Sequence, residues 1–169
     1  MDMGKLKEID RGKSMIKVFI SHKQEDWITA KSIAFELERM GVPFYLDVLD
    51  SITVKSGKEL TEHIKKNLND CTDIIVVMSE TTKNSQWVPF EVGMAAQNDM
   101  PTATFLQASV LLPDFLAYWP RLKYPSDIQK YIVARKEVKR EYSSGYLFET
   151  AMRYKSQTER FYEVLKHRL

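Results

Sequence analysis

Short apolar runs alternate with segments of helical periodicity along this chain, and no other feature limits the fold as strongly. The apolar runs are IKVFI (16–20), PFYLD (43–47), DIIVVMS (73–79) and PTATFL (101–106). The helical segments between them run from about Asp26 to Met40, from Lys58 to Asn69 and from Ser85 to Gln97. Such alternation is typical of a parallel sheet that is covered by helices on both faces. We therefore expect an α/β fold whose strands, as near-continuous apolar runs, are buried on both sides.

The predicted helices carry one apolar stripe each, which is the face that a sheet would cover. The first stripe contains Trp27, Ile33, Ala34, Leu37 and Met40, and the second contains Leu60, Ile64 and Leu68. These spacings of three and four residues place each set on one side of its helix. Gly41 follows the first helix and suits a left-handed C-terminal cap.

The chain length of 169 residues suits one domain. Residues 1–14 are polar without periodicity, which indicates a flexible leader, and residues 15–169 are expected to form a single domain. From about residue 111 a C-terminal extension begins, and the prolines of LLPDFLAYWPRLKYP indicate short turns. Two extra helices are predicted after Ser126. One passes through Ile128, Ile132 and Val133, and the other through Phe148, Met152, Phe161 and Leu165.

Composition excludes several classes of protein. Basic and acidic residues number 25 and 23, so a net charge of +2 gives no reason to expect nucleic acid as a partner. The single cysteine, Cys71, and three scattered histidines do not build a metal site of known spacing. The N-terminus lacks an apolar signal region, and no run approaches the ~18 apolar residues of a membrane span. A cytoplasmic protein without a structural metal is expected.

Polar residues follow the predicted strands, at the sheet edge where open α/β folds bind ligands. Ser21 and His22 follow the first strand, Asp47 ends the second, and Ser79 and Glu80 end the third. No G-x-G-x-x-G turn and no P-loop motif is present, so a nucleotide would have to be held in another way. A phosphoacceptor receiver domain is disfavoured, because SHKQED and VVMSE stand where its acidic residues belong.

Glu91, in the segment SQWVPFE, is the acidic residue that most needs an explanation. Pro89 fits only in a first helical turn, so the helix should begin near Asn84 or Ser85, with Glu91 about two turns in. That is too far along for a capping box. The residues three and four positions before and after Glu91 include Trp87 but no lysine or arginine. A salt bridge within the helix is therefore not available to Glu91.

Two interpretations of these neighbours stay open. Glu91 is either exposed or paired with a distant lysine, or it is a partly desolvated carboxylate of the kind found in catalytic sites. Trp87 is either a core aromatic or part of such a site.

Three segments together resemble a Toll/interleukin-1 receptor (TIR) domain. They are VFISHKQED (18–26), FYLDVLDSITVKSGKELTEHIKKNL (44–68) and DIIVVMSETTKNSQWVPFEVGMA (73–95). The resemblance implies a flavodoxin-like doubly wound sheet and, in the enzymatic members, cleavage of NAD⁺ at the nicotinamide–ribose bond by a glutamate at the position of Glu91. It also implies that Trp87 stacks on nicotinamide or adenine, and that Ser21, His22 and Asp47 line the NAD⁺ pocket.

The implied chemistry explains why one carboxylate can suffice. Most glycosidases need a second carboxyl group to protonate the leaving group. Nicotinamide leaves NAD⁺ as a neutral molecule, so no general acid is required and the carboxylate only stabilises an oxocarbenium-like centre. The resemblance thus implies NAD⁺ as the substrate and no further cofactor. Capture by water gives ADP-ribose, and internal capture gives a cyclic isomer. The short chain resembles the prokaryotic stand-alone TIR proteins of Thoeris-type antiphage systems, which make cyclic signals.

Two other functions fit the same residues. Many TIR domains only self-associate, through the loop after the second strand, here near residues 48–58. Such a module has no need of an acid at position 91. A nucleoside deoxyribosyltransferase-like enzyme shares a related fold and a carboxylate nucleophile, and it would act on a nucleoside without pyrophosphate.

Overall fold

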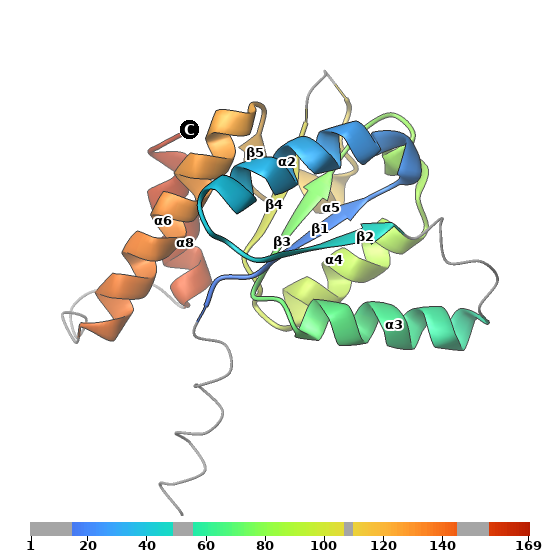
Figure 1. The fold of residues 1–169 in the computed structure, drawn as a ribbon, viewed down its shortest axis with the longest axis horizontal. Coiled ribbons are helices and arrows are strands. Elements are labelled where there is room, and N and C mark those ends of the chain that lie inside the picture. The colour runs from blue at the N-terminus through green and yellow to red at the C-terminus, as the bar shows by residue number, and fades with distance from the viewer. Residues whose placement is uncertain (1–14, 49–55, 107–109, 145–155) are drawn as a thin grey trace, which may run out of the picture.

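The central sheet has five parallel strands in the order β2-β1-β3-β4-β5 (Figure 1). The computed structural model describes residues 15–48, 56–106, 110–144 and 156–169. The strands are β1 (Val18–His22), β2 (Phe44–Val48), β3 (Asp73–Val77), β4 (Thr102–Phe105) and β5 (Arg121–Leu122). The flavodoxin-like order 2-1-3-4-5 reverses direction between β1 and β3, which makes this junction the expected ligand position.

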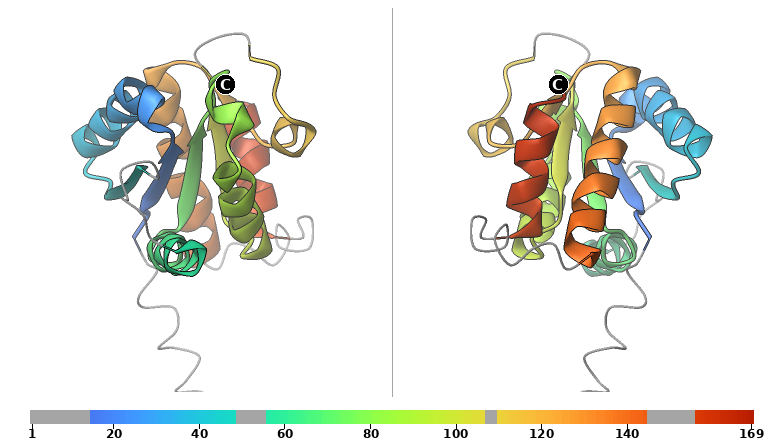
Figure 2. Two further views of the ribbon diagram at one scale, coloured as in Figure 1. Left: turned by 90° about the vertical axis from the view of Figure 1, so that its right-hand side faces the viewer. Right: turned by 90° about the vertical axis from the view of Figure 1, so that its left-hand side faces the viewer.

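Helices cover both faces of the sheet, as expected (Figure 2). They are α2 (Trp27–Arg39), α3 (Gly57–Asn69), α4 (Trp87–Gln97), α5 (Asp114–Ala117), α6 (Pro125–Ser143) and α8 (Gln157–Lys166). Two 3₁₀ turns, η1 (Gln24–Asp26) and η3 (Thr82–Asn84), precede α2 and α4. Gly41 has φ = 65° just after α2, which confirms the left-handed cap. Among the described residues no helix has the length and apolar character of a membrane span.

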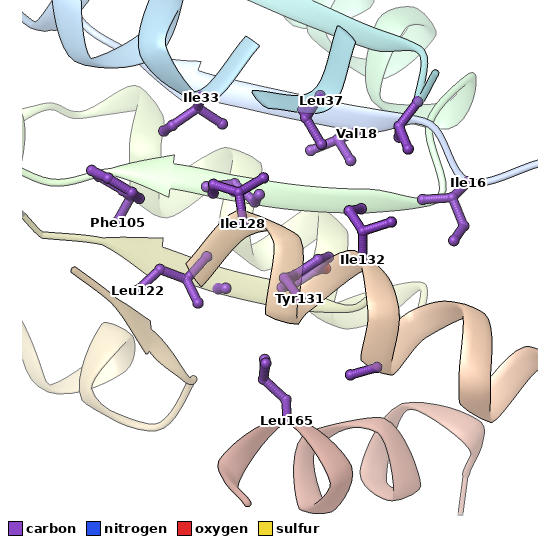
Figure 3. Packing of buried hydrophobic residues seen from close by; sticks show 14 of the residues in the cluster. Ile16, Val18, Ile33, Leu37, Phe105, Leu122, Ile128, Tyr131, Ile132 and Leu165 are labelled. Atoms are coloured by element: carbon purple, nitrogen blue, oxygen red, sulfur yellow. The ribbon is translucent and has the colours of Figure 1, made fainter. Parts of the chain in front are cut away.

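Alternation along the strands divides the buried side chains into two cores. Val18 and Ile20 of β1 belong to a core formed with α2, α6 and α8, part of which is seen in Figure 3. Phe19, between them, belongs to the opposite core, formed with α3, α4 and α5. Successive strand residues point to opposite faces, so this pattern assigns every β1 position to one layer. Ser21 therefore points to the same face of the sheet as Phe19, and His22 points to the same face as Ile20.

The start of α4 differs from the sequence prediction. The helix begins at Trp87 with Gln86 as its N-cap, not at Asn84 or Ser85, because residues 82–84 form η3. The Ser85 hydroxyl still serves the helix end, since the Trp87 amide donates to it at 3.3 Å. Pro89 is the third helical residue, where a missing N–H costs nothing. Glu91 is therefore the fifth helical residue, still beyond a capping box.

Two further details depart from the expected pattern. β1 begins two residues later than the run IKVFI and continues through Ser21 and His22, because the layers above and below cover both polar side chains. Trp27, predicted on the sheet-facing stripe of the first helix, is 38% exposed. It lies at the first residue of α2, where its ring stacks on His22 at the end of β1 and stays partly at the surface.

The C-terminal half completes the sheet. The segment predicted as short turns contains α5 and also β5, whose Leu122 carbonyl accepts from the Leu106 amide at 2.8 Å. Asp127 caps α6 by accepting the Lys123 and Tyr124 amides at 2.9 and 3.0 Å. Burial opposes ionisation of Asp127, but these hydrogen bonds together with the Lys130 ammonium, 2.9 Å from Oδ1, outweigh it and lower the pKa of Asp127. Phe148 and Met152, assigned to a last helix, and the proposed leader 1–14 lie outside the described residues.

Candidate active site

Ser21 and Glu91 meet at the switch point of the sheet. The Ser21 hydroxyl, at the carboxyl end of β1, donates to the Glu91 carboxylate on α4. Both side chains are fully buried. The contact joins residues 70 positions apart, and it follows from the alternation that turns Ser21, like Phe19, toward the layer containing α4.

Glu91 occupies a core-facing position of α4. The buried residues of this helix are Val88, Glu91, Val92 and Ala95, spaced as one stripe against the sheet. The helical pattern would place an apolar side chain at this position, but the chain has a carboxylate there. Burial of a charged group is costly unless hydrogen bonds compensate it, and the Ser21 hydroxyl provides one. The alternative of an exposed Glu91 is therefore wrong for this structure.

His22, the residue after Ser21, forms a short aromatic stack on the opposite face of the sheet from this pair. It is 1% exposed, its Nδ1 lies 3.2 Å from the Ile20 carbonyl, and its ring stacks on Trp27 with centroids 5.8 Å apart. The Lys31 ammonium lies 5.2 Å from the centroid of Trp27. His22 therefore lies in the α2 layer, whereas Ser21 and Glu91 lie in the α4 layer. The stack nevertheless begins at the residue next to Ser21.

Asp26 joins the loop after β1 to the loop after β3. Its Oδ2 accepts hydrogen bonds from Ser79, at 2.7 Å, and from Thr82. The Thr82 amide in turn donates to the Ser79 hydroxyl at 3.1 Å. This cluster, here called the Asp26 clamp, fixes the segment that leads into α4 and hence the direction from which Glu91 is presented. Asp26 is a site residue that was not predicted from the sequence; its signal there is its position as the acid that ends VFISHKQED.

Asp47 and Trp87, the remaining predicted site residues, lie on β2 and α4. Asp47 is the β2 partner of Ser21 in the parallel register, so its backbone lies at the same sheet edge. Trp87 opens α4 one turn before Glu91, is partly exposed, and meets Phe90 edge to face with centroids 6.0 Å apart. The elements thus bring all five predicted site residues to the carboxyl edge of the sheet. Among them, the Ser21 hydroxyl and the Glu91 carboxylate are joined by a direct side-chain hydrogen bond.

The chemistry available here is that of a desolvated carboxylate. Within the described parts of the chain, no three His, Cys, Asp or Glu side chains gather as a metal site would require. A carboxylate that is removed from water and held by a fixed donor can stabilise a developing positive charge strongly, because little solvent screens the interaction. The geometry therefore favours a reaction that passes through a cation.

The family model of the TIR domain matches residues 18–143, which span the sheet and its flanking helices through α6. The chain belongs to the TIR domain family. Among curated proteins no significant match to this chain is found.

Two solved structures show the same fold. One is the TIR domain of the Toll-related receptor TRR-2 from Hydra magnipapillata, with 21% identity over 73% of this chain and 95% of that chain, and a TM-score of 0.52. The other is a metazoan TIR-STING receptor from C. gigas, with 22% identity over 77% of this chain and 46% of that chain, and a TM-score of 0.54. At this level of identity the likeness concerns the fold alone.

Proposed function

We propose that this TIR domain cleaves NAD⁺ at the bond between nicotinamide and ribose, with the Glu91 carboxylate stabilising the ribosyl cation. The observation that carries the proposal is the buried Glu91 on the sheet-facing stripe of α4, hydrogen-bonded to Ser21 at the switch point. A charged group is retained there at a cost to stability, which is common where a site serves chemistry. The enzymatic TIR domains that the sequence resembles use a glutamate at this position.

The other residues have defined roles in this proposal. Ser21 orients the carboxylate through its hydroxyl. Trp87 offers a partly exposed ring to nicotinamide or adenine. His22 and Asp47 are proposed to shape the pocket from β1 and β2. No other cofactor is required, because the substrate itself carries the positive charge that makes nicotinamide a good leaving group.

Complete burial of Glu91 places a condition on the reaction. NAD⁺ reaches this carboxylate only after the groups that cover it move, so we expect the isolated protein to have a low basal rate. Assembly or a bound trigger would then raise the rate by favouring an open arrangement. We also propose, on the resemblance to Thoeris-type proteins, that the chain acts in the cytoplasm and that the product is a cyclic ADP-ribose isomer.

The test is incubation of the purified protein with NAD⁺, beside Glu91→Gln as the catalytic variant and Glu59→Gln as the matched control. Glu59 is an exposed glutamate at the start of α3. Products are separated by chromatography with mass detection. We expect Glu91→Gln to lower turnover by on the order of 10²-fold or more while Glu59→Gln leaves it unchanged. A product ~18 mass units lighter than ADP-ribose, the mass of one water, identifies a cyclase.

A non-catalytic interaction module is the second candidate, and one observation favours it. Glu91 is covered and already engaged by Ser21, as a purely structural carboxylate would be. In that case wild type and Glu91→Gln leave NAD⁺ intact at every protein concentration. We propose self-association for both candidates, since TIR domains act through contacts with one another.

A further inference from the structure

The Asp26 clamp lies across the crevice where a ligand is expected. β1 and β3 are neighbours in the sheet, and the chain leaves them toward opposite faces, into α2 and into α4. Figure 2 shows these two helices on opposite sides of the sheet. The loops after β1 and β3 therefore diverge at the switch point, and open α/β sheets bind ligands between such loops. Asp26 belongs to the first loop, whereas Ser79 and Thr82 belong to the second, so the clamp bridges the crevice.

The bridge depends on a single atom of Asp26. The hydroxyls of Ser79 and Thr82 both donate to Asp26 Oδ2, at 2.7 Å in the case of Ser79. Hydrogen bonds to a carboxylate are charge-assisted and roughly twice as strong as hydrogen bonds between neutral groups. The contact between the loops is therefore strong for its size, yet it is lost as soon as two hydroxyl groups move away from one oxygen.

Each loop keeps hydrogen bonds of its own when this bridge is broken. In the loop after β3, the Thr82 amide donates to the Ser79 hydroxyl at 3.1 Å, and the Ser85 amide donates to the Thr82 carbonyl at 2.9 Å. In the loop after β1, the Asp26 amide donates to the Lys23 carbonyl at 2.9 Å. The two loops can therefore separate as preformed units, without either turn unwinding.

The loop after β3 leads directly into the helix that carries Glu91. The Ser85 hydroxyl accepts from the Trp87 amide at the start of α4, and Glu91 follows one turn later. On the other side of the crevice, Ser21 of β1 donates to Glu91. The β1 side and the α4 side are thus joined twice, once by the fully buried contact of Ser21 with Glu91 and once by the half-buried Asp26. Movement of the loop after β3 away from Asp26 would carry the start of α4 with it.

We infer that the Asp26 clamp acts as a latch that keeps the crevice closed over Glu91, and that NAD⁺ gains access when Ser79 and Thr82 leave Asp26. The inference rests on the proposed function for the identity of the substrate, whereas the covering of Glu91 by the latch does not depend on it. A ligand that binds only the open form has an apparent affinity reduced by the fraction of open molecules. Loosening the latch should therefore lower the KM for NAD⁺ and leave kcat nearly unchanged.

The test loosens the latch from both sides. Asp26→Asn keeps the shape of the side chain but removes its charge, and Thr82→Val removes the hydroxyl of a fully buried residue. Glu25→Gln is the matched control, because it removes an exposed carboxylate from the same turn, η1. Solvent access to Glu91 is measured by carbodiimide coupling of carboxyl groups to glycine ethyl ester, with mass spectrometry of the peptides. The fully buried Asp73 reports global unfolding in the same samples.

We expect Glu91 to be labelled on the order of tenfold faster in Asp26→Asn and in Thr82→Val than in the wild type. Glu25→Gln should keep the wild-type rate at Glu91, and Asp73 should keep its wild-type rate in every variant. In NAD⁺ turnover, each latch variant should lower KM on the order of tenfold and change kcat by less than about twofold. A variant that only damaged the fold would not lower KM.

Wild-type labelling of Glu91 in both latch variants would overturn the inference, whether or not the protein cleaves NAD⁺. Labelling of Asp73 that rises together with that of Glu91 in both variants would overturn it as well, because the clamp would then stabilise the whole fold. An unchanged or raised KM beside faster labelling of Glu91 would refute the route of substrate access. Faster labelling of Glu91 alone, in a protein that leaves NAD⁺ intact, supports the latch and rejects the proposed function.

Discussion

Arg135→Met is predicted to destabilise the protein far from the candidate site. Arg135 on α6 is 8% exposed and pairs with the fully buried Asp73 at the start of β3. Its Nε lies 2.5 Å from Asp73 Oδ1, and a terminal nitrogen lies 3.3 Å from Oδ2. Tyr131 and Thr72 also donate to this carboxylate, at 2.8 and 2.6 Å. Burial opposes the charge on Arg135, but the attraction of Asp73 prevails and raises the pKa of the guanidinium.

The expected loss follows from what the substitution leaves behind. Breaking a buried ion pair at one partner costs about 3–5 kcal/mol, because a charge stays in the core without its counter-ion. The hydroxyls of Tyr131 and Thr72 still solvate Asp73 in the variant, so we place the loss near the lower limit, at about 3 kcal/mol. For a chain of this length that corresponds to a fall of roughly 6–12 °C in Tm.

Urea unfolding followed by circular dichroism at 222 nm measures this loss. Arg140→Met, on an exposed position of the same helix, is the matched control and should change the free energy of unfolding by less than about 0.5 kcal/mol. The double variant Asp73→Leu with Arg135→Met should recover at least about 1 kcal/mol, because no buried charge remains. The reasoning is refuted if Arg135→Met costs under about 1 kcal/mol, or if the double variant loses the sum of both single effects.

Two further predictions concern alkaline pH and the Asp26 clamp. Burial raises the pKa of Cys71 to about 11 and of Tyr162 to about 12, from 9.0 and 10.0. The folded state holds these two protons more tightly than the unfolded chain does. Each group therefore adds on the order of 2–3 kcal/mol to the free energy of unfolding below pH 9, and this stabilisation is lost as the pH rises toward 12. An unchanged urea midpoint between pH 8 and 11 would contradict this. Asp26→Asn should weaken the charge-assisted hydrogen bonds of Ser79 and Thr82 and speed amide exchange at Thr82 by on the order of tenfold. Exchange at the wild-type rate would show that the clamp does not hold this segment.

The sheet could be predicted from the sequence because its signals are local. Each of the first four strands is an apolar run, and each is separated from the next by a helix, so the parallel arrangement follows from the period of the pattern. β5 has only two residues, Arg121 and Leu122, and lies among prolines. It is too short for a period of its own. It is held by two long-range hydrogen bonds: the amide of Leu106, just after β4, donates to the Leu122 carbonyl, and the amide of Thr104 in β4 donates to the carbonyl of Pro120, just before β5.

The candidate site could be predicted in part. A lone acid in the helical stripe around Glu91 is visible in the sequence, and so is the polar end of β1. The Ser21–Glu91 contact and the Asp26 clamp join residues 53 to 70 positions apart, and no local pattern encodes them. The helix start was misplaced for a related reason, since Thr82 is drawn into η3 by Asp26, a residue of another loop.

The register of β1 links the core to the candidate chemistry. Val18 and Ile20 fill one core and Phe19 the other, so a shift by one residue would exchange their environments and also turn Ser21 away from α4. His22, with a ring in place of a hydroxyl, would then face Glu91. The apolar residues of β1 therefore fix which polar side chain meets the carboxylate. A substitution that loosens this strand, such as Phe19→Ala, should disturb the Ser21–Glu91 contact without touching either residue.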